Sequence, residues 1–272
     1  MNYVSLERLV KDTKSFITKL PRKEITGVIG IPKSGMLPAT IVACELRVPL
    51  APIGGTFWKD APTGGTILLI DDSIATGGEM KKAAKSIVLP QGCKLLKAAV
   101  YSSVATEDFK GGIDFCHEVV SCPRVFEWNV WSHHKIYYSM VDMDGILCLD
   151  PPVPDDDGPA YEDAIRNAVL LHVPKYELAG IATGRLERWR GITEEWLAKN
   201  GITYRALHMS QHATSRDRRR ARDVPSMKAK AYMESTAKLF IESEDRQARR
   251  ICAESNRPVL SLPAGILHNP TR

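Results

Sequence analysis

The segment TILLIDDSIATGGEM, residues 66–80, runs from a short hydrophobic stretch through two adjacent aspartates to a pair of glycines. Such a stretch is typical of a buried strand in a parallel sheet, and a helix is expected from Gly77 onward. Asp71 and Asp72 then end the strand at the carboxyl edge of the sheet, where open α/β folds bind their ligands. Carboxylates at that edge suit a sugar diol or a divalent cation.

The tetrapeptide Ala75-Thr76-Gly77-Gly78 follows the two aspartates. Backbone N–H groups at a helix N-terminus bind anions, glycines let the anion approach closely, and the Thr76 hydroxyl is a further donor. Carboxylates for a diol beside a phosphate cradle describe a ribose 5-phosphate site. The segment closely resembles the motif with which type I phosphoribosyltransferases bind phosphoribosyl pyrophosphate (PRPP); the alternative is a chance strand–turn–helix junction.

Two further segments are similar to parts of the same family pattern. GIPKSGMLPA, residues 30–39, stands where the family holds pyrophosphate, so the resemblance assigns Lys33, Ser34 and Gly35 to PRPP binding; a plain turn is the alternative. GGTFWKDAPTGG, residues 54–65, stands where the family has a mobile loop that closes over PRPP. This segment is shorter than the loop of several family branches, and Lys59 is its candidate catalytic cation.

An aromatic segment, RVFEWN at residues 124–129, resembles the part of purine-type members in which a ring stacks on the base. The resemblance makes Trp128 or Phe126 the stacking residue. A role in the core or between domains is the alternative for both aromatic side chains.

A second acidic motif, MVDMDGILC, begins at Met140 and places Asp142 and Asp144 after another hydrophobic strand. Alternate residues leaving a strand can direct one carboxylate at phosphorus as a nucleophile while the other acts as acid and base. The DxDG pattern resembles motif I of the haloacid dehalogenase (HAD) phosphatase superfamily. By that resemblance Asp142 forms an aspartyl-phosphate, and Asp144 protonates the leaving group and then activates water.

The later motifs of that superfamily are matched in order. Thr183 in IATGR fits the hydroxyl that binds a phosphoryl oxygen, and Lys228 in PSMKAKAY fits the lysine that neutralises phosphate, with Lys230 as a rival. LFIESED has Glu242-Ser243 where the family usually has Gly-Asp. Glu242 is the expected terminal metal ligand and Asp245 the alternative. Hard oxygen ligands make Mg²⁺ the expected ion in both halves of the chain, and the predicted ligands in the second half are Asp142, Asp144, Glu242 and Asp245.

The order of predicted elements gives an α/β fold class with two α/β domains. A phosphoribosyltransferase-like parallel sheet is expected over residues 1–133, and a HAD-like, Rossmannoid parallel sheet over residues 134–272. The boundary lies in the polar run WSHHK, residues 131–135, before a strand predicted at 136–141. A helix is predicted over 161–172, and the segment from Gly145 to Gly180 is too short for more than a minimal cap over the phosphatase site.

The composition is that of a soluble globular protein: 272 residues, 44% hydrophobic and 25% charged. No run approaches the roughly 18 apolar residues of a membrane span, and the N-terminal residues do not form a signal peptide, so a cytoplasmic location is expected. The net charge of +5 suits an anionic ligand, and RDRRRARD at residues 216–223 is either a solvated connection or weak evidence for nucleic-acid binding. All six cysteines are expected to be buried thiols: Cys44, Cys93, Cys116, Cys122, Cys148 and Cys252.

The sequence thus predicts a bifunctional enzyme of nucleotide metabolism. The first half would transfer a phosphoribosyl group to or from a nucleobase-like heterocycle, and the second would be a Mg²⁺-dependent phosphate monoester hydrolase. Two alternatives stay open: a regulatory protein that senses PRPP or nucleotides without turnover, and a nucleic-acid end-processing phosphatase with a sensor domain. The expected partners are PRPP or a ribonucleotide and a phosphorylated small molecule, without a membrane; nucleic acid and a homodimer are left open.

Overall fold

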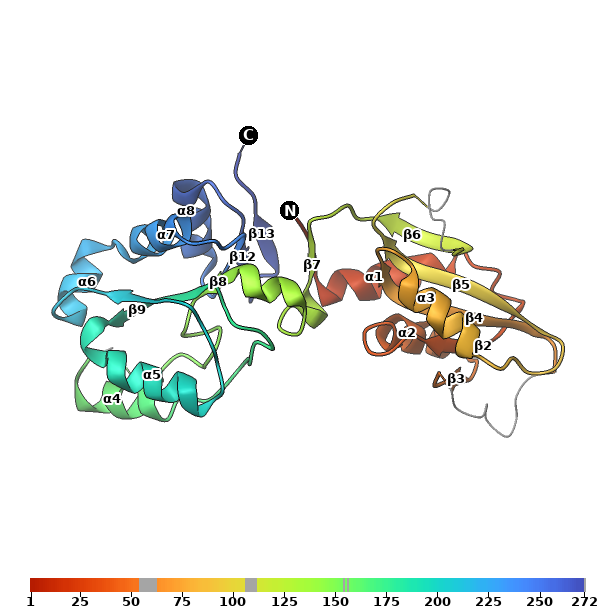
Figure 1. Cartoon of the computed structure of the whole chain (residues 1–272), viewed down its shortest axis with the longest axis horizontal. Helices are drawn as coiled ribbons and strands as arrows, with labels where there is room; N and C mark the ends of the chain where they lie inside the picture. The colour runs from red at the N-terminus through yellow and green to blue at the C-terminus, as the bar shows by residue number, and fades with distance from the viewer. Residues whose placement is uncertain (54–62, 106–111, 154, 156, 272) are drawn as a thin grey trace. The chain divides into compact units, whose positions relative to one another are not determined.

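The chain folds into two units, Met1–Trp128 and Asn129–Arg272, each with its own parallel sheet (Figure 1). The structure is a computed structural model that describes residues 1–53, 63–105, 112–153, 155 and 157–271. None of the helices within these ranges has the length and apolar character needed to cross a membrane.

The first unit contains a five-stranded sheet in the order β3-β2-β4-β5-β6, in which every neighbouring pair is parallel. Three helices, α1, α2 and α3, cover it, and β1 pairs with β7 in a separate two-stranded ribbon. The elements are β1 (Asn2–Val4), α1 (Leu6–Ile17), β2 (Ile25–Gly30), α2 (Met36–Leu46), β3 (Leu50–Ala51), β4 (Gly65–Ile74), α3 (Gly78–Ser86), β5 (Cys93–Ser102), β6 (Phe115–Val119) and β7 (Arg124–Phe126).

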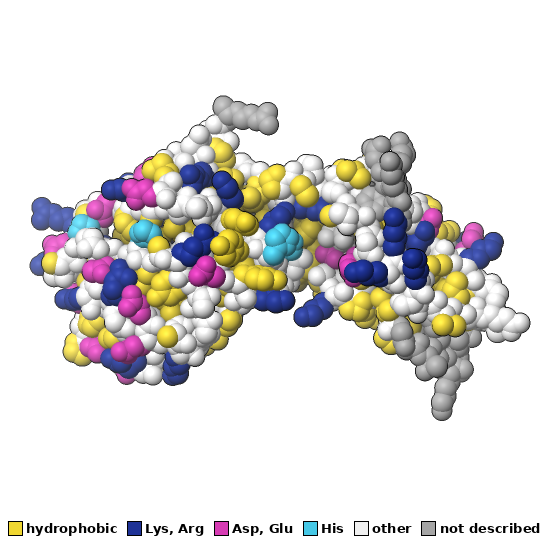
Figure 2. Space-filling view, viewed as in Figure 1, with side chains coloured by type: hydrophobic (Ala, Val, Ile, Leu, Met, Phe, Trp, Pro, Cys, Tyr) yellow, Lys and Arg dark blue, Asp and Glu magenta, His cyan; other side chains and the backbone are white. Residues whose placement is uncertain are grey.

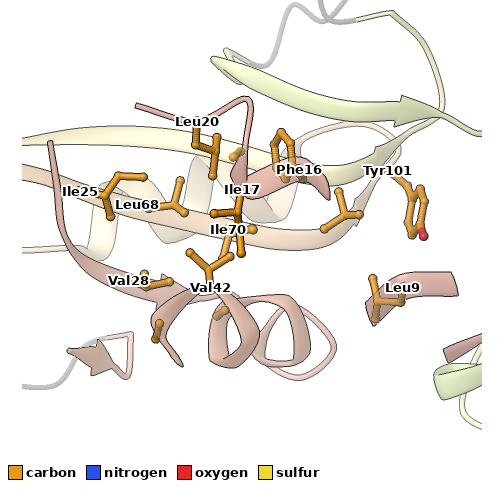
Figure 3. Packing of buried hydrophobic residues seen from close by; sticks show 14 of the residues in the cluster. Leu9, Phe16, Ile17, Leu20, Ile25, Val28, Val42, Leu68, Ile70 and Tyr101 are labelled. Atoms are coloured by element: carbon orange, nitrogen blue, oxygen red, sulfur yellow. The ribbon is translucent and has the colours of Figure 1, made fainter. Parts of the chain in front are cut away.

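Alternation along β4 builds the core on both faces of this sheet. Leu68 and Ile70 join the cluster formed with α1 and α2, in which Ile17 and Val42 take part (Figure 3). Leu69, on the opposite face, joins the cluster formed with α3. Because both faces are covered, the strand is hydrophobic from Ile67 up to Asp71, and its acidic residues are confined to the carboxyl end.

The second unit contains a six-stranded sheet in the order β10-β9-β8-β11-β12-β13, parallel except for the antiparallel pair β12-β13. Figure 1 shows α4 and α5 on one face and α7 and α8 on the other. The strands are β8 (Ser139–Val141), β9 (Gly180–Leu186), β10 (Leu207–Ser210), β11 (Leu239–Glu242), β12 (Val259–Ser261) and β13 (Ile266–His268); the helices are α4 (Gly158–Arg166), α5 (Arg190–Lys199), α6 (Ser215–Ala221), α7 (Val224–Glu234) and α8 (Asp245–Ser255).

Two predicted elements differ from the observed ones. The strand predicted over 136–141 is only β8, because His134–Tyr138 form a 3-10 helix. The helix predicted over 161–172 is α4, which ends at Arg166. The residues after it are extended, since Leu149 donates to the carbonyl of Val169 at 2.9 Å and Leu171 donates to that of Leu147 at 2.9 Å. Backbone pairing with the segment after β8 therefore overrides the helical pattern.

The prediction that all six cysteines are buried was wrong. Only Cys148 and Cys252 are buried, whereas Cys44 and Cys122 are exposed and Cys93 and Cys116 are partly exposed. Most of the arginine-rich run forms helix α6, which lies between β10 and α7 and whose N-cap Thr214 accepts the backbone N–H of Asp217 at 3.2 Å.

Candidate functional site

The two adjacent aspartates of the first unit lie near the carboxyl end of strand β4, which continues to Ile74. Asp71 and Asp72 are 8% and 4% exposed. Asp71 Oδ1 accepts the backbone N–H of Asp72 at 2.9 Å. Both carboxylates are therefore buried near the carboxyl end of a central strand, and the Asp71 carboxylate is held by a hydrogen bond.

Burial, and then the neighbouring charge of Asp72, raises the pKa of Asp71 to about 9. The folded protein therefore keeps a proton on Asp71 at neutral pH. A bound cation would favour loss of that proton because it lowers the cost of two buried like charges. The pair fits either a sugar diol, through hydrogen bonds, or a hard cation, through its oxygens.

The predicted pyrophosphate loop lies directly against this pair. A Cβ atom at Gly35 would lie 2.8 Å from Asp71 Oδ1 and 2.6 Å from the carbonyl oxygen of Ile31, so only glycine permits this approach. Lys33 is exposed and Ser34 partly exposed in the same turn, directly before α2. The structure thus brings the turn of Lys33, Ser34 and Gly35 to the aspartates although more than thirty residues of sequence separate them.

The predicted phosphate cradle lies between β4 and α3. Gly77 has φ +75°, a left-handed conformation that side chains disfavour, and it caps α3. Ala75 and Thr76 are exposed, and Ser103 Oγ donates to the carbonyl of Ala75 at 3.1 Å. A Cβ at Gly78 would meet only Thr76 Oγ1, at 3.8 Å, so the helix start is open to an approaching anion.

The two stacking candidates in the aromatic segment differ in burial and in their contacts. Phe126 is 6% exposed and stacks on Tyr101 and Trp128, with ring centroids 5.8 and 4.9 Å away. Its ring belongs to the core. Trp128 is partly exposed, and its Nε1 donates to Asp72 Oδ2 at 2.8 Å, which ties this ring to the acidic pair. Lys59 lies outside the described residues.

In the second unit, three of the predicted catalytic residues and the predicted metal ligand Glu242 come from neighbouring elements. Asp142 follows β8, Thr183 is in β9, Glu242 ends β11 and Lys228 is in α7. Lys228 Nζ lies 2.9 Å from Asp142 Oδ2 and 2.9 Å from Glu242 Oε2. All four residues are at most 5% exposed. The rival Lys230 is exposed, so Lys228 is the lysine at the site.

The two carboxylates that share the Lys228 ammonium group differ in the direction of their pKa shifts. Burial, and then the charge of Glu242, raises the pKa of Asp142 well above its ordinary value. Burial also acts to raise the pKa of Glu242, but Lys228 and hydrogen bonds outweigh it, so that pKa is lowered. Burial acts to lower the pKa of Lys228, yet the two carboxylates raise it above its ordinary range. A charged lysine therefore holds Glu242 ionised and leaves Asp142 the more readily protonated group.

The second carboxylate, Asp144, is bound by an arginine that sequence reasoning missed. Arg185 is 1% exposed; its Nη2 lies 2.5 Å from Asp144 Oδ1, and its Nε lies 3.0 Å from Oδ2. Arg185 also donates its backbone N–H to Thr183 Oγ1 at 3.2 Å. Residues two apart on a strand share a face, so the spacing of Thr183 and Arg185 in IATGR was the signal that could have revealed this partner.

The predicted metal-binding set is not assembled. Glu242 directs its oxygens to Lys228 and to the N–H and hydroxyl of Ser243. Asp245 instead pairs with Arg249 at 2.8 Å and with His268 at 2.7 Å. With Asp144 held by an arginine and Asp142 by a lysine, the residues present do not fit Mg²⁺ as arranged.

Within the described part of the chain, the three acidic or histidine side chains close enough to share an ion are Asp12, His117 and Glu118. Arg8 already pairs with both of these acids, at 3.2 and 2.6 Å. Arg8 therefore already compensates part of the negative charge of this cluster.

A pocket of about 1290 Å³ opens over the Asp142 site. It is lined by Asp142, Thr183 and Lys228, by the segment after β8 and by arginines of α8 and of α6 and its C-cap. Figure 2 shows basic and acidic side chains interspersed over the visible face of this unit. The pocket itself is more basic, because cationic residues outnumber acidic ones in its lining.

No family model matches the chain, and no curated protein matches it. Among solved structures it is similar to a purine phosphoribosyltransferase from Pyrococcus horikoshii Ot3, with 16% identity, 47% of this chain and 92% of that chain covered, and a TM-score of 0.39. It is also similar to a xanthine-guanine-hypoxanthine phosphoribosyltransferase from Helicobacter pylori (14%, 47% and 93%, TM-score 0.41). A third is a hypothetical protein from Neisseria gonorrhoeae with bound ppGpp (16%, 48% and 90%, TM-score 0.39).

Proposed function

We propose that the first unit is a phosphoribosyltransferase that uses PRPP and a nucleobase-like heterocycle. The observation that carries this proposal is the close approach of Gly35 to Asp71, which joins two sequence motifs into one site. Asp71 and Asp72 would orient the ribose hydroxyls. Lys33 and the backbone amides of its turn would stabilise the departing pyrophosphate, the amides of 75–78 would hold the 5-phosphate, and Mg²⁺ bound with the substrate would neutralise part of its charge.

Calorimetry with PRPP tests this assignment. Asp72→Asn keeps an oxygen acceptor for Trp128 but removes one charge, and Gly77→Val disfavours the left-handed turn, so each should weaken binding at least tenfold. The matched control is Glu7→Gln, an exposed carboxylate on α1. The assignment is wrong if the wild type binds neither PRPP nor a ribonucleotide in the presence of Mg²⁺.

For the second unit, the proposed reaction is hydrolysis of a phosphate monoester. The contact of Lys228 with both Asp142 and Glu242, next to Thr183, carries this proposal. Asp142, once ionised, attacks phosphorus, and the bond to the leaving alcohol breaks as the alcohol takes up a proton. Lys228 and Thr183 hold phosphoryl oxygens during the transfer. Water then cleaves the acyl-phosphate and restores the carboxylate.

Asp144 is the proposed proton donor and, in the second step, the base for water. Both of its oxygens accept hydrogen bonds from Arg185. The reaction therefore requires Arg185 to release at least one oxygen when substrate enters. No step is assigned to a metal ion, because the carboxylates as arranged are already paired with cations of the chain.

Phosphate release from a panel of nucleotides and sugar phosphates tests the hydrolase. Asp142→Asn should abolish release, whereas Asp163→Asn, an exposed position on α4, should not change it. Equal release by Asp142→Asn and wild type would contradict the nucleophile assignment. The pairing of Asp144 with Arg185 favours one alternative, a unit that binds phosphorylated ligands without turnover; binding by a wild type that releases no phosphate would support that alternative.

A further inference from the structure

The pocket of the second unit extends beyond the residues that act on one phosphate. Five arginines line it besides Arg185, namely Arg218, Arg219, Arg222, Arg246 and Arg250. We propose that this pocket binds a small molecule with two phosphate groups, one held at Asp142 and the other on the arginines of α6 and α8. This inference rests on the proposed hydrolase function and specifies its substrate class.

The pocket is larger than a small phosphate ester needs. The pocket measures about 1290 Å³, whereas pockets for drug-sized ligands are about 300–1,000 Å³. Apolar side chains of Leu149, Val153 and Tyr161 line it together with the charged ones. A cavity of this size and mixed lining fits an organic body with charged groups at two places better than a small phosphate ester.

The arginines of the pocket differ in their hydrogen-bond and ion-pair partners. Arg218 donates to the carbonyl of Gly184, and Arg250 pairs with Glu254 at 2.6 Å. Arg250 also donates to the backbone carbonyl of Arg222 at 2.8 Å, which joins the end of α6 to α8. Neither the Arg222 nor the Arg246 side chain has a hydrogen-bond or ion-pair partner within the described parts of the chain. These two cations are thus placed on a fixed frame and available to a ligand.

One of the pocket arginines, Arg219, already binds an anionic group of the chain. Asp155 accepts two hydrogen bonds from the Arg219 guanidinium, each 3.2 Å, and one from Ser215 Oγ at 3.0 Å. Hydrogen bonding by Ser215, followed by Arg219, lowers the pKa of Asp155. A phosphate offers more acceptor oxygens than a carboxylate and suits the planar guanidinium fork equally well.

The test compares bisphosphates with the monophosphates derived from them. Adenosine 3′,5′-bisphosphate and fructose 1,6-bisphosphate are the probes, so that a nucleoside and a sugar source are distinguished. The wild type should have a kcat/KM at least tenfold higher for one bisphosphate than for its monophosphates. In Arg222→Gln/Arg246→Gln this ratio should fall toward one, because each charge-assisted contact is worth about tenfold or more.

Matched controls are Arg220→Gln on α6 and Arg249→Gln on α8, exposed arginines that do not line the pocket. Both should keep the wild-type ratio. A wild type without preference for either bisphosphate, or a double variant that keeps the preference, would overturn the inference. A stronger preference for an oligonucleotide phosphorylated at both ends would overturn the assignment to a small molecule.

A binding measurement, which needs no turnover, tests this inference separately from the proposed function. If the wild type releases no phosphate, the hydrolase proposal fails, and calorimetry with the two bisphosphates then decides the inference alone. Binding by the wild type that weakens at least tenfold in the double variant supports a two-phosphate pocket. Absence of binding, or equal binding by both proteins, refutes it.

Discussion

Replacing Asp71 by asparagine should make the protein more stable at neutral and basic pH. Asp71 is 8% exposed, and its pKa is raised from an ordinary 3.8 to about 9, first by burial and then by Asp72. Between these two values the unfolded chain has lost a proton that the folded chain keeps. The free energy of unfolding therefore falls as pH rises, by about 1.4 kcal/mol per pH unit.

From pH 5 to pH 8 this single group should lower the stability of the wild type by up to about 4 kcal/mol. The asparagine side chain would keep an oxygen that accepts the N–H of Asp72 but would have no charge to bury. The variant should lack this contribution, and its advantage over the wild type should grow with pH. Titrating groups other than Asp72, the direct neighbour of Asp71, are common to both proteins and cancel in the difference.

The assay is thermal melting of the full chain from pH 5 to pH 8, where 1 kcal/mol corresponds to a few degrees. Glu7→Gln on α1 is the control, since it removes an exposed carboxylate and should leave the pH profile parallel to that of the wild type. If the profile of Asp71→Asn were also parallel, Asp71 would not bind a proton in the folded state, and the electrostatic account of this site would be wrong.

Three further substitutions test the packing of the sites. Gly35→Ala places a methyl group 2.6 Å from a carbonyl oxygen and should cost about 1–3 kcal/mol in urea unfolding, whereas Gly191→Ala, with open space around it, should cost nothing. Lys228→Met leaves two buried carboxylates without a cation and should cost about 3–5 kcal/mol in thermal unfolding, while Lys230→Met, exposed on the same helix, should be neutral; equal effects would contradict the buried ion pairs. Arg185→Gln frees a carboxylate and should tighten Mg²⁺ binding in calorimetry; weaker or unchanged binding would contradict the competition between arginine and metal.

Local patterns indicated the positions of the carboxylates because these follow directly from strand order. A buried parallel strand is hydrophobic until it reaches the edge of the sheet, so the first acidic residues after TILLI and after SMV mark that edge. Thr183 and Lys228 were also placed from sequence, and the structure buries both on elements that neighbour the strand before Asp142.

Those local patterns could not predict contacts between segments that are distant in the sequence. Nothing local shows that the guanidinium of Arg185 holds Asp144, or that Glu242 turns to Lys228 instead of a metal. The extended residues after α4 are equally non-local, since their hydrogen bonds go to the segment that follows β8. Residues 161–172 do have helical periodicity. Backbone pairing with the segment after β8 nevertheless determines the structure beyond Arg166.

The two candidate sites compensate buried negative charge in different ways. Asp71 and Asp72 receive hydrogen bonds but no ion pair from the described residues, so a proton on Asp71 limits the charge until a ligand or cation arrives. In the second unit the chain supplies the cations itself: Asp142 and Glu242 share Lys228, and Arg185 binds Asp144.

In the first unit, ligand binding should consequently change the protonation of Asp71. In the second unit it should require rearrangement of arginines. In the second unit the cations nearest Asp142 are already paired, so a phosphorylated substrate must find most of its counter-charge elsewhere in the pocket. The side chains of Arg222 and Arg246 are the lining cations that meet this need without breaking an ion pair within the described chain. Charge balance at Asp142 and Asp144 thus gives a physical reason why the same pocket also contains five further arginines.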